Sequence, residues 1–246
     1  MPPATLETLL TYDALLAAAV TTVFAGGAWL LRGVTTGGAL AGFAVAFTIF
    51  VSAGPGGFAV LITVFAIAWI TTRLGYRRKR ALGMSQDLGG RSAAQVVANL
   101  GAAAVFSLAS TMSAQRGWFL LMAMAALAEA AADTAASECG EALSDRAYLM
   151  TSLRAVRPGT DGGISLPGTL SAMSAALIIA AVAAATHVAA WSMLPVVAGA
   201  GVLGCVIDSL LGATLERRGI IGNNGVNLAG TLAAAVLALL LGNVLG

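Results

Sequence analysis

Long apolar segments separated by short polar loops constrain this chain more than any other feature. A helix that crosses a bilayer needs about 20 predominantly apolar residues. The sequence offers eight such segments: Tyr12–Leu31, Val34–Val51, Gly57–Thr72, Ser92–Ser110, Gly117–Ser137, Pro167–Ala189, Leu194–Leu215 and Asn227–Val244. Only 10% of the residues are charged, against roughly 25% in ordinary soluble domains. We therefore expect an all-α polytopic transmembrane bundle of about eight (seven to eight) helices, in which residues 1–246 form a single integral membrane domain. The second and third segments are short for two complete crossings.

The distribution of basic residues predicts the orientation of this bundle. With eight crossings, all of the 13 Lys and Arg residues except Arg116 fall in loops on one side. Loops rich in Lys and Arg usually lie in the cytoplasm, so we expect both termini outside, in a bacterial inner membrane. The net charge of only +2 does not indicate a nucleic-acid partner, and no oligomeric state is predicted.

Acidic residues inside the predicted helices are the first candidates for function. A charge at the centre of a spanning helix costs roughly 2.5–3.5 kcal/mol, and such residues are functional candidates by default. Asp133, Glu138 and Asp208 are expected at one level near the cytoplasmic face, with Glu129 one turn deeper. Three carboxylates at one depth repel one another unless a cation joins them, and carboxylate oxygens without a nearby His favour Mg²⁺. We predict that Asp133, Glu138 and Asp208 are catalytic and bind Mg²⁺. The alternative is that they only hydrogen-bond between helices.

Amide side chains reach the same level from two further helices. Gln95 and Asn99 open the fourth predicted helix behind Arg91, and Asn224 and Asn227 open the eighth. We predict that these five residues position the phosphate of an acceptor substrate. For Gln95 and Asn99, a purely structural role in helix packing is an equally good interpretation.

A loop rich in glycine precedes the sixth predicted helix. Its amides and the dipole of the following helix point toward the cytoplasmic side, which is typical of a phosphate-binding site. It does not have the spacing of a Walker A loop. We predict that it binds the phosphates of a nucleotide through Pro158, Gly159, Thr160, Asp161, Gly162, Gly163, Ser165, Gly168 and Thr169.

Taken together, these motifs resemble a known membrane family. The segments that carry the resemblance are 132–140, 158–165 with Gly168 and Thr169, Arg91 with 95–99, 208–213 and 224–227, over about residues 73–230. The family includes plant and cyanobacterial phytyl-phosphate kinase and was long catalogued as domain of unknown function 92. Asp161 departs from its pattern, because a small or uncharged polar residue is expected there.

The resemblance implies a membrane kinase that transfers the γ-phosphate of a nucleotide to an isoprenyl or phytyl monophosphate, giving the diphosphate. CTP is the expected donor, because the family is distantly similar to phytol and dolichol kinases and to phosphatidate cytidylyltransferases. Two other reactions stay open, namely phosphorylation of a prenyl alcohol and CTP-dependent transfer of a cytidylyl group to a lipid. A transporter is the alternative of another class, although transporters usually place their charges near the midplane, often between inverted repeats.

Overall fold

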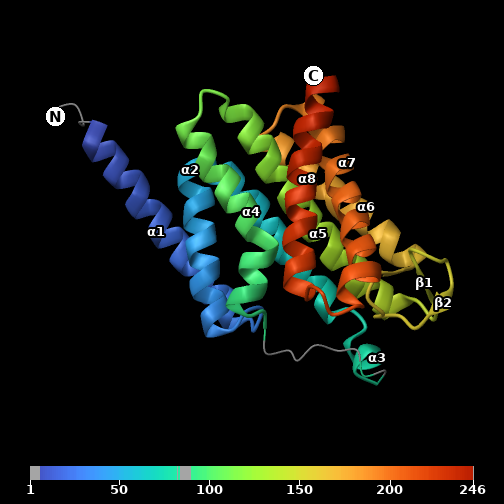
Figure 1. Ribbon diagram of the computed structural model, residues 1–246. Coiled ribbons are helices and arrows are strands. Elements are labelled where there is room, and N and C mark those ends of the chain that lie inside the picture. The colour runs from blue at the N-terminus through green and yellow to red at the C-terminus, as the bar shows by residue number, and fades with distance from the viewer. Residues whose placement is uncertain (1–5, 82, 84–89, 246) are drawn as a thin grey trace.

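The computed structural model describes residues 6–81, 83 and 90–245 and forms a helical bundle (Figure 1). Among these residues, six helices are long and apolar enough to cross a membrane, and a seventh apolar helix, α1, is described in full only over Ala14–Leu30. The all-α transmembrane fold class is thereby confirmed. The helices are α1 (Leu6–Leu30), α2 (Thr36–Arg73), α3 (Tyr76–Ala81), α4 (Ala93–Met112), α5 (Arg116–Leu143), α6 (Leu166–Ala185), α7 (Leu194–Leu211) and α8 (Asn223–Leu245). A 3₁₀ turn, η1 (Trp191–Met193), precedes α7, and a π-helical turn, η2 (Gly212–Glu216), follows it.

Helix α2 consists of two halves that run in opposite directions, because the chain reverses at Gly54. This residue has φ 71° and ψ −172° and is followed by Pro55, a conformation that is essentially confined to glycine. A straight helix of 38 residues would be about 57 Å long. Instead, Nη2 of Arg73, at its end, donates to the carbonyl oxygen of Leu31, just before its start, at 2.7 Å. The second and third predicted segments therefore run in opposite directions, in agreement with seven to eight crossings.

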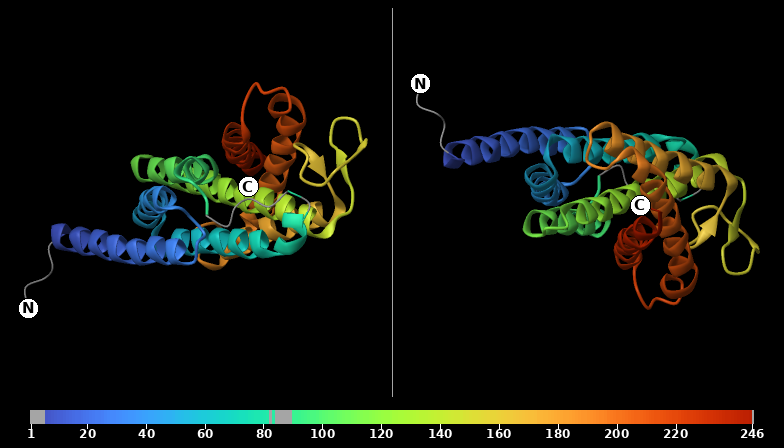
Figure 2. Two further views of the ribbon diagram at one scale, coloured as in Figure 1. Left: turned by 90° about the horizontal axis from the view of Figure 1, so that it is seen from below. Right: turned by 90° about the horizontal axis from the view of Figure 1, so that it is seen from above.

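Helix α5 is the centre of the bundle. In its most apolar window 83% of the residues are buried, against 39–44% in the other five candidate spans. It packs against α2, α4, α6, α7 and α8, whereas α1 lies at one edge and the strands at the opposite edge (Figure 2). The helix continues to Leu143, six residues beyond its predicted end, so Glu138 lies on the helix rather than after it.

A small antiparallel sheet interrupts the segment between α5 and α6. Strands β1 (Ala147–Leu149), β2 (Ala155–Val156) and β3 (Gly163–Ile164) pair in the order β2-β1-β3. The sequence analysis expected only a loop here, because strands of two or three residues are too short to show an alternating pattern. The glycine-rich segment forms the loop that connects β2 to β3 on either side of β1, and it closes against the end of the bundle.

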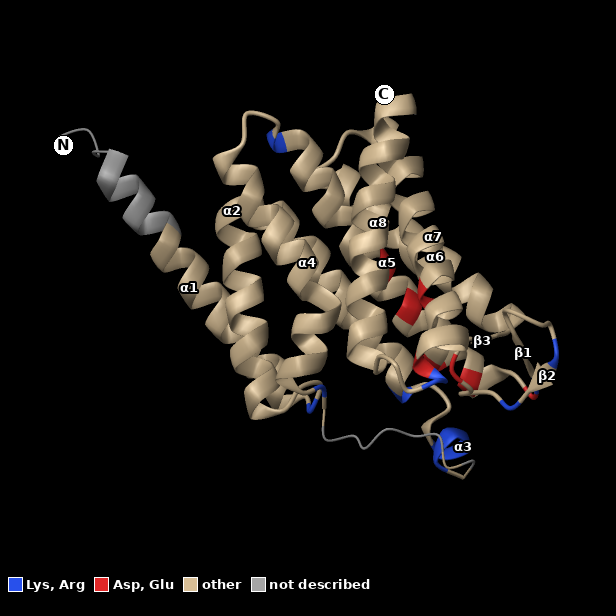
Figure 3. Ribbon diagram, viewed as in Figure 1, with Lys and Arg blue, Asp and Glu red and all other residues tan. Residues whose placement is uncertain are grey.

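Charged side chains gather at one end of the bundle (Figure 3). The loops that carry the predicted cytoplasmic basic residues all lie at this end, hereafter the charged end, while Arg116 begins α5 at the other. Helix α1 begins and α8 ends at the end opposite the charged one (Figure 1). The chain termini, Met1 and Gly246, lie outside the described residues, and the assignment of the charged end to the cytoplasm stays a prediction.

Candidate active site

A cavity of about 460 Å³ opens at the charged end, between the end of α2, α3, α4, α5, the small sheet with its glycine-rich loop, α6, α7 and α8. It collects the predicted site residues from all of these elements except α2 and α3. Those that line it are Arg91, Gln95, Asn99, Asp133, Glu138, Pro158, Gly159, Thr160, Asp161, Gly162, Gly163, Ser165, Gly168, Thr169, Asp208 and Asn227. Asn224 does not line the cavity and is exposed, whereas its neighbour Asn223 does line it.

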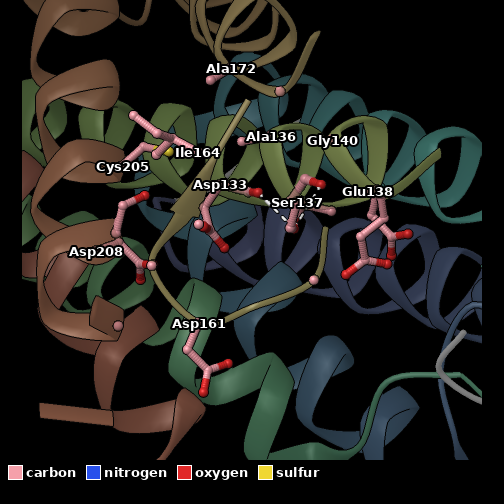
Figure 4. Close-up of a pocket in the computed structure, with 18 of the residues that line it drawn as sticks. Asp133, Ala136, Ser137, Glu138, Gly140, Asp161, Ile164, Ala172, Cys205 and Asp208 are labelled. Carbon is pink, nitrogen blue, oxygen red and sulfur yellow. Dashed lines mark hydrogen bonds between the residues drawn. The ribbon is translucent and has the colours of Figure 1, made fainter. Parts of the chain in front are cut away.

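Asp133 and Asp208 form a pair of carboxylates at the inner wall of this cavity (Figure 4). Asp133 comes from α5 and Asp208 from α7. Asp208 is 8% exposed, and its Oδ2 atom has no hydrogen-bond partner among the described residues. A buried carboxylate without a donor is costly unless a cation or a proton compensates it. The pair therefore fits Mg²⁺, which proteins usually bind through one or two carboxylates together with substrate phosphates.

Glu138 differs from the prediction, because its carboxylate is already bound by other groups. Its Oε2 atom forms an ion pair with Nζ of Lys79, and its Oε1 atom accepts from the hydroxyl of Thr72 at 2.8 Å. Within residues 6–81, 83 and 90–245, no three His, Cys, Asp or Glu side chains are placed to hold one metal ion. The centre of three carboxylates that was predicted over Asp133, Glu138 and Asp208 is therefore not preformed.

Lys79 is a cavity residue that the sequence analysis missed. Its side chain is only 2% exposed, although it comes from the basic run of the short helix α3. Besides Glu138, it donates to the carbonyl oxygen of Thr72 at 2.9 Å, which fixes α3 against α2 and α5. In the sequence Lys79 stands between Arg78 and Arg80 as one more loop charge, and no signal distinguishes it.

The backbone of Arg91 is fixed by two hydrogen bonds to the connection between α1 and α2. Its amide donates to the carbonyl of Gly33 at 3.0 Å, and its carbonyl accepts from the amide of Thr35 at 3.0 Å. The guanidinium reaches α5, where Nη2 donates to Oγ1 of Thr134 at 3.2 Å. Burial lowers the pKa of the Arg91 guanidinium from its ordinary value, and the negative charges of Glu138 and Asp133 oppose this shift. An arginine stays protonated at neutral pH, so it offers a fixed positive charge to an anion.

The predicted amide residues make structural hydrogen bonds. Gln95 closes a capping box with Ser92 at the start of α4, where Oε1 of Gln95 accepts from the Ser92 amide at 2.8 Å. Asn227 of α8 donates through Nδ2 to Oδ1 of Asn99 on α4 at 3.2 Å. Asn99 in turn donates to the carbonyl of Gln95 at 2.9 Å. These bonds support the structural interpretation of Gln95 and Asn99, and a role with the acceptor phosphate stays a prediction.

The glycine-rich loop between β2 and β3 packs directly on the end of α7. Gly162 has φ 69°, and a Cβ atom there would lie 2.3 Å from the amide nitrogen of Ala213 in η2. Only glycine allows this approach. The π-helical turn lies one turn beyond Asp208, and such turns are frequent at functional sites.

Several donors of the predicted phosphate loop are engaged within the loop itself. The hydroxyl of Thr160 donates to the carbonyl of Arg157 at 2.7 Å. Ser165 caps α6, accepting from the amide of Gly168 at 3.3 Å with its hydroxyl and from that of Thr169 at 2.8 Å with its carbonyl. The loop therefore offers the dipole of α6 and the remaining amides, rather than all of the donors that the sequence suggested.

Negative charge dominates the cavity wall. Of the residues described around it, two are basic, Lys79 and Arg91, and six are acidic: Asp133, Glu138, Glu141, Asp161, Asp208 and Glu216. Asp161, which departs from the expected pattern, lies on the loop between β2 and β3 and is drawn below Asp133 and Asp208 in Figure 4. A polyphosphate could enter such a cavity only together with cations, because its own charge would otherwise be repelled.

Comparison with known proteins gives a family and several relatives. The family described as integral membrane protein DUF92 matches residues 19–235. An uncharacterized membrane protein of Methanocaldococcus jannaschii is 30% identical over 74% of this chain and 74% of its own length. Two proteins of Arabidopsis thaliana are also similar. Protein PGR is 26% identical over 94% of this chain and 97% of its own length, and the chloroplastic protein VTE6 is 24% identical over 88% and 67%. No solved structure gives a significant match.

Proposed function

The chain belongs to the DUF92 family of integral membrane proteins, and from this premise we propose that it is a membrane phosphotransferase. The reaction is transfer of the γ-phosphate of a nucleotide, expected to be CTP, to an isoprenyl or phytyl monophosphate, giving the diphosphate. The observation that carries the proposal is that Asp133, Asp208 and Arg91 line one cavity at the end of a membrane bundle. Few other functions need a cation site and an anion site at the level where a lipid headgroup meets water.

Each side of the cavity has its own task in this proposal. Asp133 and Asp208 hold Mg²⁺ together with the nucleotide phosphates, and the metal when bound neutralises phosphate charge during the transfer. The glycine-rich loop and the positive end of the α6 dipole face those phosphates. Arg91, fixed by its backbone bonds to the α1–α2 connection, holds the acceptor phosphate.

The chain needs little acid–base chemistry for this reaction. Phosphoryl transfer depends mainly on positioning and on neutralisation of charge, and a phosphate monoester is already largely ionised near neutral pH. Glu138 takes no metal in the proposal. Through its ion pair with Lys79 it holds α3 and α5 together at the rim of the cavity.

The test uses purified protein in detergent with γ-labelled CTP, Mg²⁺ and a series of prenyl monophosphates. Label is expected in a prenyl diphosphate, with CDP as the second product. Asp208→Asn is expected to reduce the rate at least about 100-fold, because the site then loses one charged ligand. Asp145→Asn is the matched control, since this carboxylate is 95% exposed and pairs only with Arg78 at the surface.

Product identity decides between the possible outcomes. Release of pyrophosphate with formation of a CDP-lipid would assign cytidylyl transfer instead. Conversion of a prenyl alcohol to its monophosphate would assign the alcohol kinase. If no label moves from CTP or ATP although the folded protein binds Mg²⁺ and prenyl monophosphate, the phosphotransferase proposal is wrong.

A further inference from the structure

A second cavity of about 100 Å³ lies between α1, α2 and α4, beside α5. Its wall is largely apolar and includes Phe24 of α1, Phe65 of α2 and Leu100 of α4. The rings of Phe24 and Phe65 pack edge to face with centroids 5.5 Å apart. The cavity is therefore a defined space bounded by packed side chains on the side of the bundle where α1 forms the outer layer (Figure 2).

The two cavities share one wall. Thr72, Arg91, Gln95 and Asn99 line both of them, so the polar cavity and the apolar cavity meet at Arg91. Arg73 also lines the second cavity at this end, where its guanidinium carbon lies 4.0 Å from the ring centroid of Trp69. A single molecule with an anionic head and an apolar tail could thus place its head at Arg91 and its tail between α1, α2 and α4.

We propose that the second cavity binds the prenyl chain of the acceptor, next to its phosphate, an inference that rests on the proposed function. Apolar cavities of about 150 Å³ accept a guest of the size of benzene. A space of about 100 Å³ therefore suits the first branched isoprene unit, and the rest of a long chain extends toward the lipid. Because lipid tails are as apolar as the cavity wall, the cavity contributes orientation and selection by shape rather than affinity.

Gly42 is the position at which this cavity can be filled without disturbing the fold. It lines the cavity from α2, and a Cβ atom built on it meets no other atom within 4 Å. A leucine at position 42 would project into the space that the isoprene unit is to occupy. Gly199 of α7 offers a matched control, because it is also a half-buried helical glycine with nothing within 4 Å of its Cβ position, and it lines neither cavity.

The first experiment locates the chain directly and does not depend on turnover. Purified protein is irradiated with a geranyl monophosphate that carries a diazirine on its first isoprene unit, and the labelled peptides are identified by mass spectrometry. Labelling is expected in the segments that line the cavity, which are α1, both halves of α2, the start of α4 and the part of α5 around Ala130. It should fall at least tenfold in Gly42→Leu and be unchanged in Gly199→Leu.

The second experiment measures transfer to geranyl monophosphate. Gly42→Leu should reduce kcat/KM for this acceptor at least tenfold, since displacement of a substrate by about 1 Å can cost about 100-fold, while KM for the nucleotide stays unchanged. Unchanged nucleotide KM and thermal unfolding show that the variant is folded.

Labelling in other helices, or equal labelling of Gly42→Leu and wild type, would overturn the assignment of this cavity while leaving phosphoryl transfer by the wild type intact. A competition experiment shows whether the cavity takes the prenyl chain of the acceptor or the acyl chain of a membrane lipid. An excess of unlabelled prenyl monophosphate should displace the probe, and phosphatidylglycerol should not. Equal displacement by both would make the cavity a general lipid site and would also overturn the proposal. If the wild type transfers no phosphate but is labelled as expected, only the proposed function fails.

Discussion

Replacing Lys79 by Met tests whether Glu138 is a structural partner or a metal ligand. Lys79 is 2% exposed and Glu138 is 14% exposed, so water can replace the ion that is removed only in part. Loss of one partner of a buried ion pair costs about 3–5 kcal/mol, because the other charge is left uncompensated. In Lys79→Met the Glu138 carboxylate keeps only the hydroxyl of Thr72 as a donor.

The expected change in melting temperature follows from this cost. For a chain of this size about 1 kcal/mol corresponds to roughly 2–4 °C, so Tm should fall by about 6–20 °C in Lys79→Met. The double variant Lys79→Met/Glu138→Gln removes both charges and should lose clearly less than the sum of the two single variants. A coupling free energy of about 2–3 kcal/mol is expected for groups in direct contact.

The assay combines thermal unfolding in detergent with phosphoryl transfer measured well below the lowest Tm. A structural pair predicts that both Glu138→Gln and the double variant keep turnover within about tenfold of wild type. The reasoning is refuted if Tm does not change in Lys79→Met. It is equally refuted if Glu138→Gln loses turnover at least about 100-fold at unchanged Tm and the double variant does not recover it, which is the behaviour of a metal ligand.

Three further predictions test single features of the structure. Gly54→Ala should lower the free energy of unfolding by about 1–3 kcal/mol, because the backbone conformation at this position is essentially confined to glycine. Gly199→Ala should be neutral or stabilising, and denaturant titration compares the two variants. Gly230→Ala should cost about 1–3 kcal/mol by overpacking, since the new Cβ atom would lie 2.5 Å from Oε1 of Glu129, and an unchanged Tm would contradict this contact. Arg91→Lys keeps the charge but loses the planar fork, so KM for the prenyl monophosphate should rise about tenfold while KM for the nucleotide stays constant in steady-state assays.

The helical crossings could be predicted from the sequence because hydropathy is a local property. A segment of apolar residues is driven into the bilayer by its own composition. The basic loops then indicate on which side of the membrane each crossing begins and ends. The predicted reversal between the second and third segments agrees with the structure, since Gly54 and Pro55 mark it in the sequence. The three strands were not predicted because they are too short to show an alternating pattern. The π-helical turn after α7 was not predicted either, and it lies where Gly162 approaches Ala213, a contact between segments distant in the sequence.

The sequence predicted the depth of the candidate site in the bundle, but not the arrangement of its side chains. The cost of a charge in a spanning helix identifies Asp133 and Asp208 one residue at a time, and their helices bring them together. The sequence analysis did not predict which polar groups are left free by internal hydrogen bonds and ion pairs. Gln95 is used by a capping box with Ser92, for which the sequence carries the local pattern Ser-x-x-Gln. Glu138 is used by Lys79, a pairing between distant residues of which the sequence gives no sign.

By itself, the sequence determined that this chain crosses a membrane repeatedly, with its basic loops on one side and its acidic side chains gathered near them. Only the tertiary structure decided that Lys79 binds Glu138, that Oδ2 of Asp208 is left without a donor in the described part of the chain, and that a second, apolar cavity meets the first at Arg91. The physical reason is that hydropathy and charge act on each residue separately. Hydrogen-bond partners and cavities arise only when helices distant in the sequence pack against one another.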